Sequence, residues 1–311
     1  MTTSDAARAL PVSAPGKRRL RQDRFAPYFF ISPFYILFII FFLFPSLFAL
    51  ALGFFKWNAL GTPEFFALRN YDYLFKQPLF WTSVQNTIFY AAASLFIVAP
   101  LALLEAIALN SKRLRLRSLW RTLYFAPIVT STVAISLVFR LMYNTDYGLI
   151  NGFIMSLGGT PIPWMESPGL TKFAVMGVVI WRWTGLLAIY FLAGLQSISE
   201  ELYEAAAIDG ANGLQKFFFV TLPMLRPVIL FVAILVLIGS LQIFDDPQIL
   251  FGNATPGGPG SSALSIVQYL YQQGITQQLF GFASAIGTFL FIVIFGLSLV
   301  QLRVFRGFGG D

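Results

Sequence analysis

An arginine between two tryptophans, Trp181-Arg182-Trp183, stands inside a long apolar stretch of this chain. A charged side chain in such a stretch faces a bundle interior or a cavity far more often than lipid, because burying charge in hydrocarbon is costly. The flanking rings have the composition of a stacking platform for a sugar. The alternative is a clamp between helices, since carbonyl groups and helix ends can also accommodate an arginine. The sequence leaves both interpretations open.

Histidine and cysteine are absent from the 311 residues. Their absence excludes disulfides, thiol chemistry, imidazole metal ligands and histidine proton relays. No phosphate-binding loop of the G-x-x-x-x-G-K-[ST] type is present either, because the sole Gly-Lys pair, Gly16-Lys17, is followed by Arg18. We therefore expect no covalent catalysis, no nucleotide site, no metal and no other cofactor in this chain.

The composition requires a membrane. Hydrophobic residues make up 57% of the chain and charged residues 11%, against about 25% charged in soluble domains. A helix that spans the bilayer needs roughly 20 mainly apolar residues. Six stretches qualify, at residues 28–52, 86–109, 125–143, 173–195, 228–244 and 282–299. The sequence predicts an all-α, polytopic membrane protein with about six transmembrane helices.

The basic residues orient these spans. If the N-terminus is cytoplasmic, fifteen of the 21 lysines and arginines fall in cytoplasmic segments, as the positive-inside rule requires. Both termini are then cytoplasmic. The same bias explains the net charge of +7, so nucleic-acid binding is not needed to account for it. We expect a basic tail at 1–26, a membrane domain at 27–306 and a short tail at 307–311.

Other polar groups accompany these spans. Glu105 lies about 6 Å from the inner end of its helix and Arg182 roughly 13 Å from the outer end of its own, at about 1.5 Å per residue. We do not expect these two residues to pair. Gln242, Asp245 and Asp246 stand at the outer end of the fifth span. They could bind solute hydroxyls, although solvation at the surface explains them equally well.

A segment at 197–226, between the fourth and fifth spans, differs from the other connections. Ser199 is suited to cap a helix, and Glu200 and Glu201 suit the positive end of the helix dipole. The alanines at 205–207 favour helix and leave room for another backbone. The segment should therefore begin with a short helix on the cytoplasmic side.

A turn and a second helix should follow. Gly210 and Gly213 can bracket the turn, since glycine adopts positive φ without penalty. The second helix carries phenylalanines at 217–219, and we expect Pro223 to end it. Such an elbow could rest on lipid as an amphipathic helix or dock on another protein. The spacing of its residues favours docking.

The elbow contains Glu204-Ala205-Ala206, then Gly210-Ala211 and Leu222-Pro223. This pattern resembles the EAA loop of binding-protein-dependent ABC importer permeases, and departs from it only at Val220, where that family usually has isoleucine. Further agreement lies in Arg69-Asn70-Tyr71, Phe80-Trp81, Asn86-Thr87, Gly148 to Asn151, Trp181 to Gly185 and Gly257-Gly258-Pro259. The resemblance covers roughly residues 27–306 and is to the maltose and glycerol-phosphate branch of carbohydrate importers.

The resemblance implies roles for individual residues. In that family the EAA loop docks as a coupling helix on an ATPase, so Glu204 would make polar contacts, Ala205 and Ala206 would permit close seating, and Gly210 would form the turn. The implied coupling residues are Glu204, Ala205, Ala206, Asp209, Gly210, Ala211, Leu222 and Pro223. The candidates for the solute path are Trp181, Arg182, Trp183, Gln242 and Asp245.

The resemblance also implies partners. ABC ATPase subunits would bind ATP and Mg²⁺ in trans, leaving this chain non-catalytic. A second homologous permease, forming a heterodimer, would complete the pathway, and an extracytoplasmic binding protein would deliver a sugar or related solute. The chain would lie in the inner (plasma) membrane of a prokaryote.

Two other classes of membrane protein remain as alternatives. An ion-coupled secondary transporter would also have spans with buried ionisable residues, but it predicts inverted repeats and a dense ionisable relay, and the sequence has neither. A structural or assembly protein would leave the elbow without a purpose.

Overall fold

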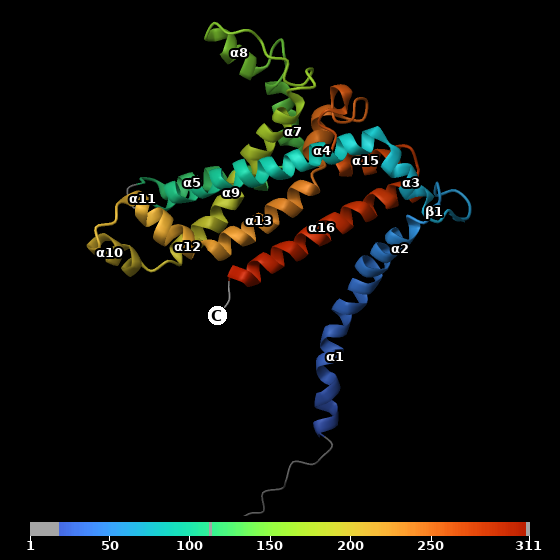
Figure 1. The fold of residues 1–311 in the computed structure, drawn as a ribbon, viewed down its shortest axis with the longest axis horizontal. Coiled ribbons are helices and arrows are strands. Elements are labelled where there is room, and N and C mark those ends of the chain that lie inside the picture. The colour runs from blue at the N-terminus through green and yellow to red at the C-terminus, as the bar shows by residue number, and fades with distance from the viewer. Residues whose placement is uncertain (1–18, 112–113, 309–311) are drawn as a thin grey trace, which may run out of the picture. The chain divides into compact units, whose positions relative to one another are not determined.

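A computed structural model of the chain describes residues 19–111 and 114–308 (Figure 1). The chain divides into two compact units, 1–49 and 50–311. Most of the expected tails, at 1–26 and 307–311, falls outside the described residues, as do Lys112 and Arg113 of the cytoplasmic basic set. The described chain is helical apart from one two-stranded hairpin. The all-α prediction is therefore confirmed.

The N-terminal unit is a helical rod. It contains α1 (Arg19–Phe38), the π-helical turn η1 (Ile39–Leu43) and most of α2 (Phe44–Leu52). Its phenylalanines stack along one side, with ring centroids 6.1 Å apart for Phe34 and Phe38 and 5.1 Å apart for Phe38 and Phe42. Helix α1 begins at Arg19, inside the stretch expected as a tail.

The second unit holds the remaining elements. In chain order, its elements up to residue 156 are β1 (Phe55–Lys56), β2 (Glu64–Phe65), α3 (Arg69–Lys76), α4 (Pro78–Ala93), η2 (Ser94–Val98), α5 (Ala99–Asn110), α6 (Arg117–Val129), α7 (Thr132–Met142) and α8 (Leu149–Ser156). The rest are α9 (Thr171–Gln196), α10 (Glu200–Ile208), α11 (Gly213–Lys216), η3 (Phe217–Thr221), α12 (Leu222–Met224), α13 (Arg226–Leu241), α14 (Asp245–Phe251), η4 (Pro259–Ser261), α15 (Ile266–Tyr271), η5 (Gln272–Thr276) and α16 (Phe280–Phe308).

Five of the six predicted spans are confirmed as continuous helical stretches. Among the described residues, the stretches long and apolar enough to cross a membrane are Pro27–Leu52, Pro78–Asn110, Thr171–Gln196, Arg226–Phe251 and Phe280–Arg303. The second begins eight residues before the expected start at 86, because α4 extends outward beyond the purely apolar sequence. The helical core of the fifth ends at Leu241, and α14 then follows.

The third expected span, 125–143, is wrong as a single helix. Helices α6 and α7 meet at an angle of 97° across a break of two residues. Thr130 and Ser131 both have extended ψ angles there, 145° and 126°. The Thr130 hydroxyl donates to the Ala126 carbonyl at 2.8 Å, which satisfies a helix-end acceptor that would otherwise be unpaired. Hydropathy alone does not register such a break.

π-helical turns precede three of the prolines in helical segments. Three of these turns, η1, η2 and η3, each end two residues before a proline, namely Pro45, Pro100 and Pro223. The wider turn closes on an i to i+5 hydrogen bond, from Phe44 to Ile39, Ala99 to Ser94 and Leu222 to Phe217. A proline has no N–H and its ring crowds the preceding turn, so a locally wider turn removes the conflict without ending the helix.

Buried polar side chains of α4 hold a distant outer loop. The Asn86 amide donates to the carbonyls of Ser261 (3.1 Å) and Leu264 (3.0 Å), and the Tyr90 hydroxyl donates to that of Ala263 at 2.8 Å. Residues about 175 positions apart in sequence are thereby joined. The Asn86 and Gly257 segments, both part of the family resemblance, thus meet in one place.

Two further buried asparagines hold connecting segments in place through side-chain hydrogen bonds to the backbone. Asn70 donates to the carbonyls of Gly53 and Phe55, both at 2.9 Å. Asn151 donates to the Ile162 carbonyl at 2.9 Å and accepts from the Ile162 amide at 3.0 Å. A buried amide side chain that pairs on both its donor and acceptor sides, as that of Asn151 does, fixes a loop strongly. Both asparagines therefore act in the architecture of the connecting loops.

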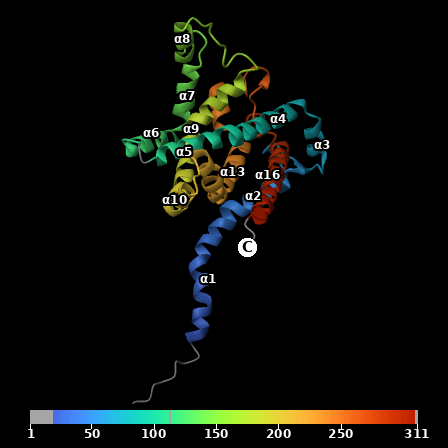
Figure 2. The same cartoon turned by 60° about the vertical axis from the view of Figure 1, so that its left-hand side comes forward.

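Helix α9 is the central helix of the second unit. It packs against α5, α6 and α13, which surround it in both views (Figures 1 and 2). Gly185 marks the closest approach, because a Cβ built there would collide with the carbonyl oxygen of Tyr124 on α6. Small residues permit such approach in membranes, where no hydrophobic effect drives helix association.

Replacement of Gly185 by valine should therefore destabilise the bundle. We expect a loss of about 2–3 kcal/mol, the range typical of forced overpacking, because the neighbouring backbone cannot move aside as a side chain can. The matched control is Gly296→Ala on α16, where an added Cβ meets nothing within 4 Å. Thermal unfolding of both variants in detergent measures the difference, and equal midpoints would contradict the close contact.

Candidate functional site

The expected elbow is present, and its first helix is α10. Ser199 caps this helix, its hydroxyl accepting from the Glu201 amide, and Glu200 and Glu201 occupy the first turn. The Ser199 cap and the acidic first turn are confirmed. No residue of α10 is buried in the chain.

Gly210 ends α10 in the left-handed conformation, with φ at 81°. The Ala211 amide donates to the Ala206 carbonyl at 2.9 Å, and the Gly210 amide donates to the Ala207 carbonyl at 3.1 Å. This pair of bonds is the Schellman arrangement, which needs a residue that tolerates positive φ at its turn. The predicted turn at Gly210 is confirmed, whereas Gly213 is the first residue of α11.

The second helix begins with a cap that the sequence analysis did not use. Asn212 and Gln215 form a capping box, with bonds of 2.9 Å and 2.8 Å between each side chain and the other's amide. The pattern of an asparagine followed three residues later by a glutamine could have revealed it. The helix does not end at Pro223 as expected, because α12 continues from η3 through the proline and ends one residue later, at Met224.

The elbow is tied to the membrane helices. The Tyr203 hydroxyl on α10 lies 2.9 Å from the Thr221 hydroxyl on η3. A cavity of about 620 Å³ lies beside the elbow and is lined by Asn110 of α5, Arg117 of α6 and Gln196 of α9, with Glu204 and Lys216 from the elbow itself. The elbow and residues of α5, α6 and α9 thus line one cavity.

The predicted coupling residues lie on this elbow. Glu204, Ala205, Asp209 and Gly210 are exposed, while Ala206, Ala211, Leu222 and Pro223 are half-buried. Apolar side chains beside them also face outward, with Ile208 87% exposed and Phe219 78% exposed. An exposed surface that combines small, acidic and large apolar residues is typical of a protein interface.

Arg182 is a clamp between helices. Its Nη1 atom lies 3.0 Å from Oδ1 of Asp246, and the two side chains are only 12% and 4% exposed. The pair joins α9 to α14, and the guanidinium also lies over the Trp183 ring, 5.2 Å from its centroid. The explanation of Asp246 by surface solvation is wrong, because its carboxylate is buried and paired with a residue 64 positions away.

The other candidates for the solute path do not form one cluster. Trp181 lines a cavity with α5 and α6, whereas Trp183 lines a different cavity, of about 310 Å³, with α13. The structure does not bring the two rings together as a shared platform. Gln242 and Asp245 are exposed at the outer end of α13 and the start of α14.

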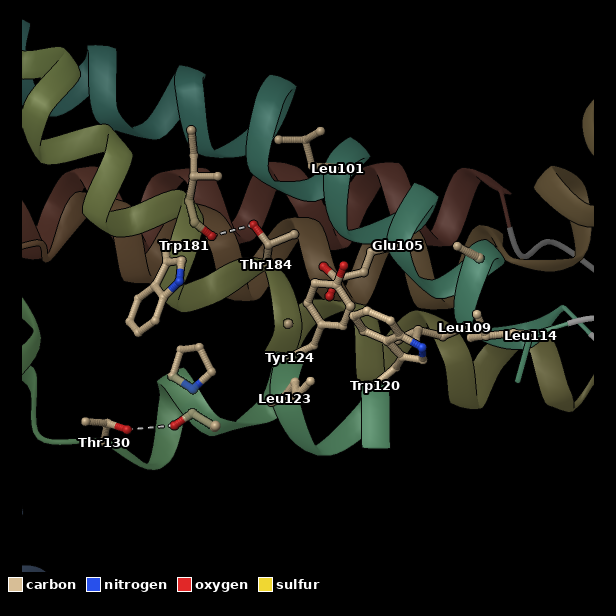
Figure 3. A pocket seen from close by; sticks show the side chains of 15 residues that line it. Leu101, Glu105, Leu109, Leu114, Trp120, Leu123, Tyr124, Thr130, Trp181 and Thr184 are labelled. Atoms are coloured by element: carbon tan, nitrogen blue, oxygen red, sulfur yellow. Dashed lines mark hydrogen bonds between the residues drawn. The ribbon is translucent and has the colours of Figure 1, made fainter. Parts of the chain in front are cut away.

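As predicted, Glu105 and Arg182 do not pair with each other. Glu105 lines the cavity that also contains Trp181, with a volume of about 800 Å³, and its carboxylate projects inward beside Tyr124 and Trp120 (Figure 3). No residue that the structure describes donates a hydrogen bond to its buried Oε1 atom.

Removal of one partner from the buried ion pair should be costly. Arg182→Ala leaves the Asp246 carboxylate buried and unpaired, which is expected to cost about 3–5 kcal/mol. The double replacement Arg182→Met with Asp246→Leu should recover most of that stability, since apolar residues of similar volume replace buried pairs well. Thermal unfolding in detergent gives the values.

The exposed pair between Lys76 and Asp72 supplies the matched control. Its atoms lie 2.7 Å apart but the side chains are 69% and 66% exposed. Lys76→Ala should therefore cost less than about 0.5 kcal/mol. Equal effects of Lys76→Ala and Arg182→Ala would show that burial does not strengthen the Arg182 contact.

Comparisons with known proteins agree with this architecture. Residues 99–306 match the family described as "Binding-protein-dependent transport system inner membrane component". The chain is 38% identical to the arabinooligosaccharides transport system permease protein AraP of Bacillus subtilis, over 97% of this chain and 96% of that one. It is 35% identical to the lactose transport system permease protein LacF of Rhizobium radiobacter, over 89% and 93%.

The fold is that of a solved transporter subunit. A chain in the crystal structure of a bacterial alginate ABC transporter, in complex with an alginate pentasaccharide-bound periplasmic protein, superposes with a TM-score of 0.82. The two chains are 23% identical, and the match covers 94% of this chain and 98% of the other. From the family match, the relatives and the fold together, this chain belongs to the binding-protein-dependent inner membrane permeases of ABC importers.

Proposed function

We propose that the chain forms one half of a translocation pathway for a carbohydrate and couples that pathway to ATPase subunits through the α10–α11 elbow. The observation that carries this proposal is the elbow itself. It presents Glu204, Ala205 and Gly210 on an exposed surface, and it is held in shape by the Schellman turn and by the Asn212 capping box.

In this proposal, the elbow is the part of the permease that responds to ATP binding by the partner ATPases. Alternating access requires two states whose balance is reversed in each cycle, and a change from 1:99 to 99:1 takes about 5.5 kcal/mol of differential binding. In this proposal, ATP and Mg²⁺ bound by the partner ATPases supply that difference by moving α10. The chain itself remains non-catalytic.

The proposed solute class is carbohydrate. It is supported by the names of relatives, which include an arabinooligosaccharide permease and a lactose permease. Trp183 offers a ring to the cavity between α9 and α13, and Gln242 offers an exposed amide at the end of α13. Aromatic faces pack on sugar rings, and amides bond to hydroxyls. Arg182 acts here as a positioning residue, because it is occupied by Asp246.

The remaining partners follow from the same reasoning. One chain of about six spans encloses half a pathway, so a second permease of the same family completes it. A solute-binding protein delivers the carbohydrate at the outer face, and both termini of the chain lie in the cytoplasm. The excess of basic residues in the inner segments supports this orientation.

Transport should require the whole assembly. Reconstitution of the chain with its second permease, ATPases and binding protein should give ATP-dependent uptake of labelled oligosaccharide into liposomes. The chain alone should give none, with or without ATP. Uptake by the isolated chain without ATP would contradict the proposal.

Disruption of the elbow should separate the ATPase from the permease. Glu204→Lys reverses a charge on the exposed surface, and Gly210→Pro cannot adopt the required φ of 81°. Both should reduce ATPase co-purification at least tenfold, equivalent to about 1.4 kcal/mol, with membrane insertion unchanged. Pull-down from mild detergent and stimulated ATP hydrolysis are the measurements.

Two variants control for charge and for turn chemistry. Glu64→Lys makes the same charge change on the exposed strand β2, away from the elbow, and should co-purify normally. Gly210→Asn keeps a residue that tolerates the left-handed region and should retain most of the ATPase. Normal ATPase binding by Glu204→Lys and Gly210→Pro would exclude α10 as the docking element.

A further inference from the structure

The cavity of about 800 Å³ beside Glu105 is not explained by the transport cycle. It lies between α5, α6 and α9. Trp183 and α13 line a separate cavity on the other side of α9. Of the solute-path candidates, Trp181 lines this cavity, Trp183 lines the other, and Gln242 lines neither.

Glu105 and Trp181, which both line the cavity, lie at different distances from the C-terminal ends of their helices. Glu105 lies five residues before the end of α5 at Asn110, or about 8 Å from the inner end of that helix at about 1.5 Å per residue. Trp181 lies fifteen residues before the end of α9 at Gln196, about 22 Å from its inner end by the same measure. The space thus runs from near the C-terminal end of α5 to the middle of α9, with Glu105 and Trp181 at different depths (Figure 3).

The chemistry of the inner end selects for a cation. Among the described residues that line the cavity, Glu105 is the sole charged one, and its Oε1 accepts no hydrogen bond from any of the residues described. The hydroxyls of Thr130 and Thr184 already donate to carbonyls of their own helices. Trp120 and Tyr124 add ring faces, which attract cations.

The outer part of the cavity is suited to a hydrocarbon chain. Its walls are formed by Leu101, Leu123, Ile180 and Trp181. An amphiphile with a cationic head and an apolar tail therefore matches the cavity in both polarity and direction. Two basic residues of α6, Arg117 and Arg121, lie within one helical turn of Trp120 but outside the lining of this cavity, and basic side chains near the end of a span attract lipid phosphates.

We propose that this cavity binds one phospholipid whose headgroup carries a primary ammonium, of the phosphatidylethanolamine type. The ammonium donates to the Glu105 carboxylate, the phosphate lies toward the basic start of α6, and one acyl chain follows the wall toward Trp181. The site rests on the membrane position of these helices and is independent of which solute is carried.

The test uses the intact transporter in nanodiscs with matched acyl chains. Native mass spectrometry counts the lipids retained from phosphatidylethanolamine, from phosphatidylcholine, whose ammonium has no N–H, and from phosphatidylglycerol, which has no cation. The wild type should retain phosphatidylethanolamine over the other two. Glu105→Gln should reduce that retention about tenfold, the effect of losing one charge-assisted hydrogen bond.

Two further variants make the result specific. Glu166→Gln removes a carboxylate that lines a different cavity and should retain lipid as the wild type does. Ala108→Trp fills the Glu105 cavity and should displace all three lipids alike. If Glu105→Gln does not assemble, loss of the phosphatidylethanolamine preference in Ala108→Trp serves as the test.

Three outcomes would overturn the proposal. The first is equal retention of the three lipids by the wild type, and the second is unchanged retention in both Glu105→Gln and Ala108→Trp. The third is occupation of the cavity by another chain. Because the chain has no cysteine, Ala108→Cys gives a single site for cross-linking, and efficient capture of the second permease from it would identify a protein occupant.

Discussion

The bilayer interior offers no hydrogen-bond partners, so every polar group inside it must be satisfied by the protein. This constraint explains the form of the helices. Pro45 and Pro100 remain within spans, each preceded by a π-helical turn that keeps the helix continuous. Where the helix does break, at Thr130, a hydroxyl satisfies the freed carbonyl. For the same reason, buried asparagines such as Asn86 donate to backbone carbonyls and hold the connecting loops in place.

The Arg182–Asp246 pair follows from the same rule, applied to charge. A guanidinium at this depth needs an anion, and α14 supplies it from beyond the end of α13. Such a pair contributes little net stability compared with apolar residues, but loss of either partner is expensive. It therefore fixes the relation of α14 to α9 more than it strengthens the bundle, and it determines where the outer end of the fifth span can lie.

Much of this architecture could be predicted from the sequence, because hydropathy and helix-end signals are local. The spans, the Ser199 cap and the Gly210 turn depend on residues that are close together in the chain. The break at Thr130, the passage of the helix through Pro223 and the burial of Asp246 could not be predicted in this way. Each depends on contacts or backbone adjustments that spacing does not encode, as with Asp246, whose partner is 64 residues away.

The elbow and the ion pair lie at opposite ends of α13. From Tyr203, the contact with Thr221 leads into η3 and α12, and α13 then runs from Arg226 to Leu241. Sixteen helical residues span about 24 Å, so α13 separates the elbow from the non-helical residues 242–244 that lead into α14. Asp246 follows α13 through that short connection, whereas Arg182 lies on α9. The Arg182–Asp246 contact therefore ties the segment after α13 to α9, at the end of α13 that is opposite the elbow.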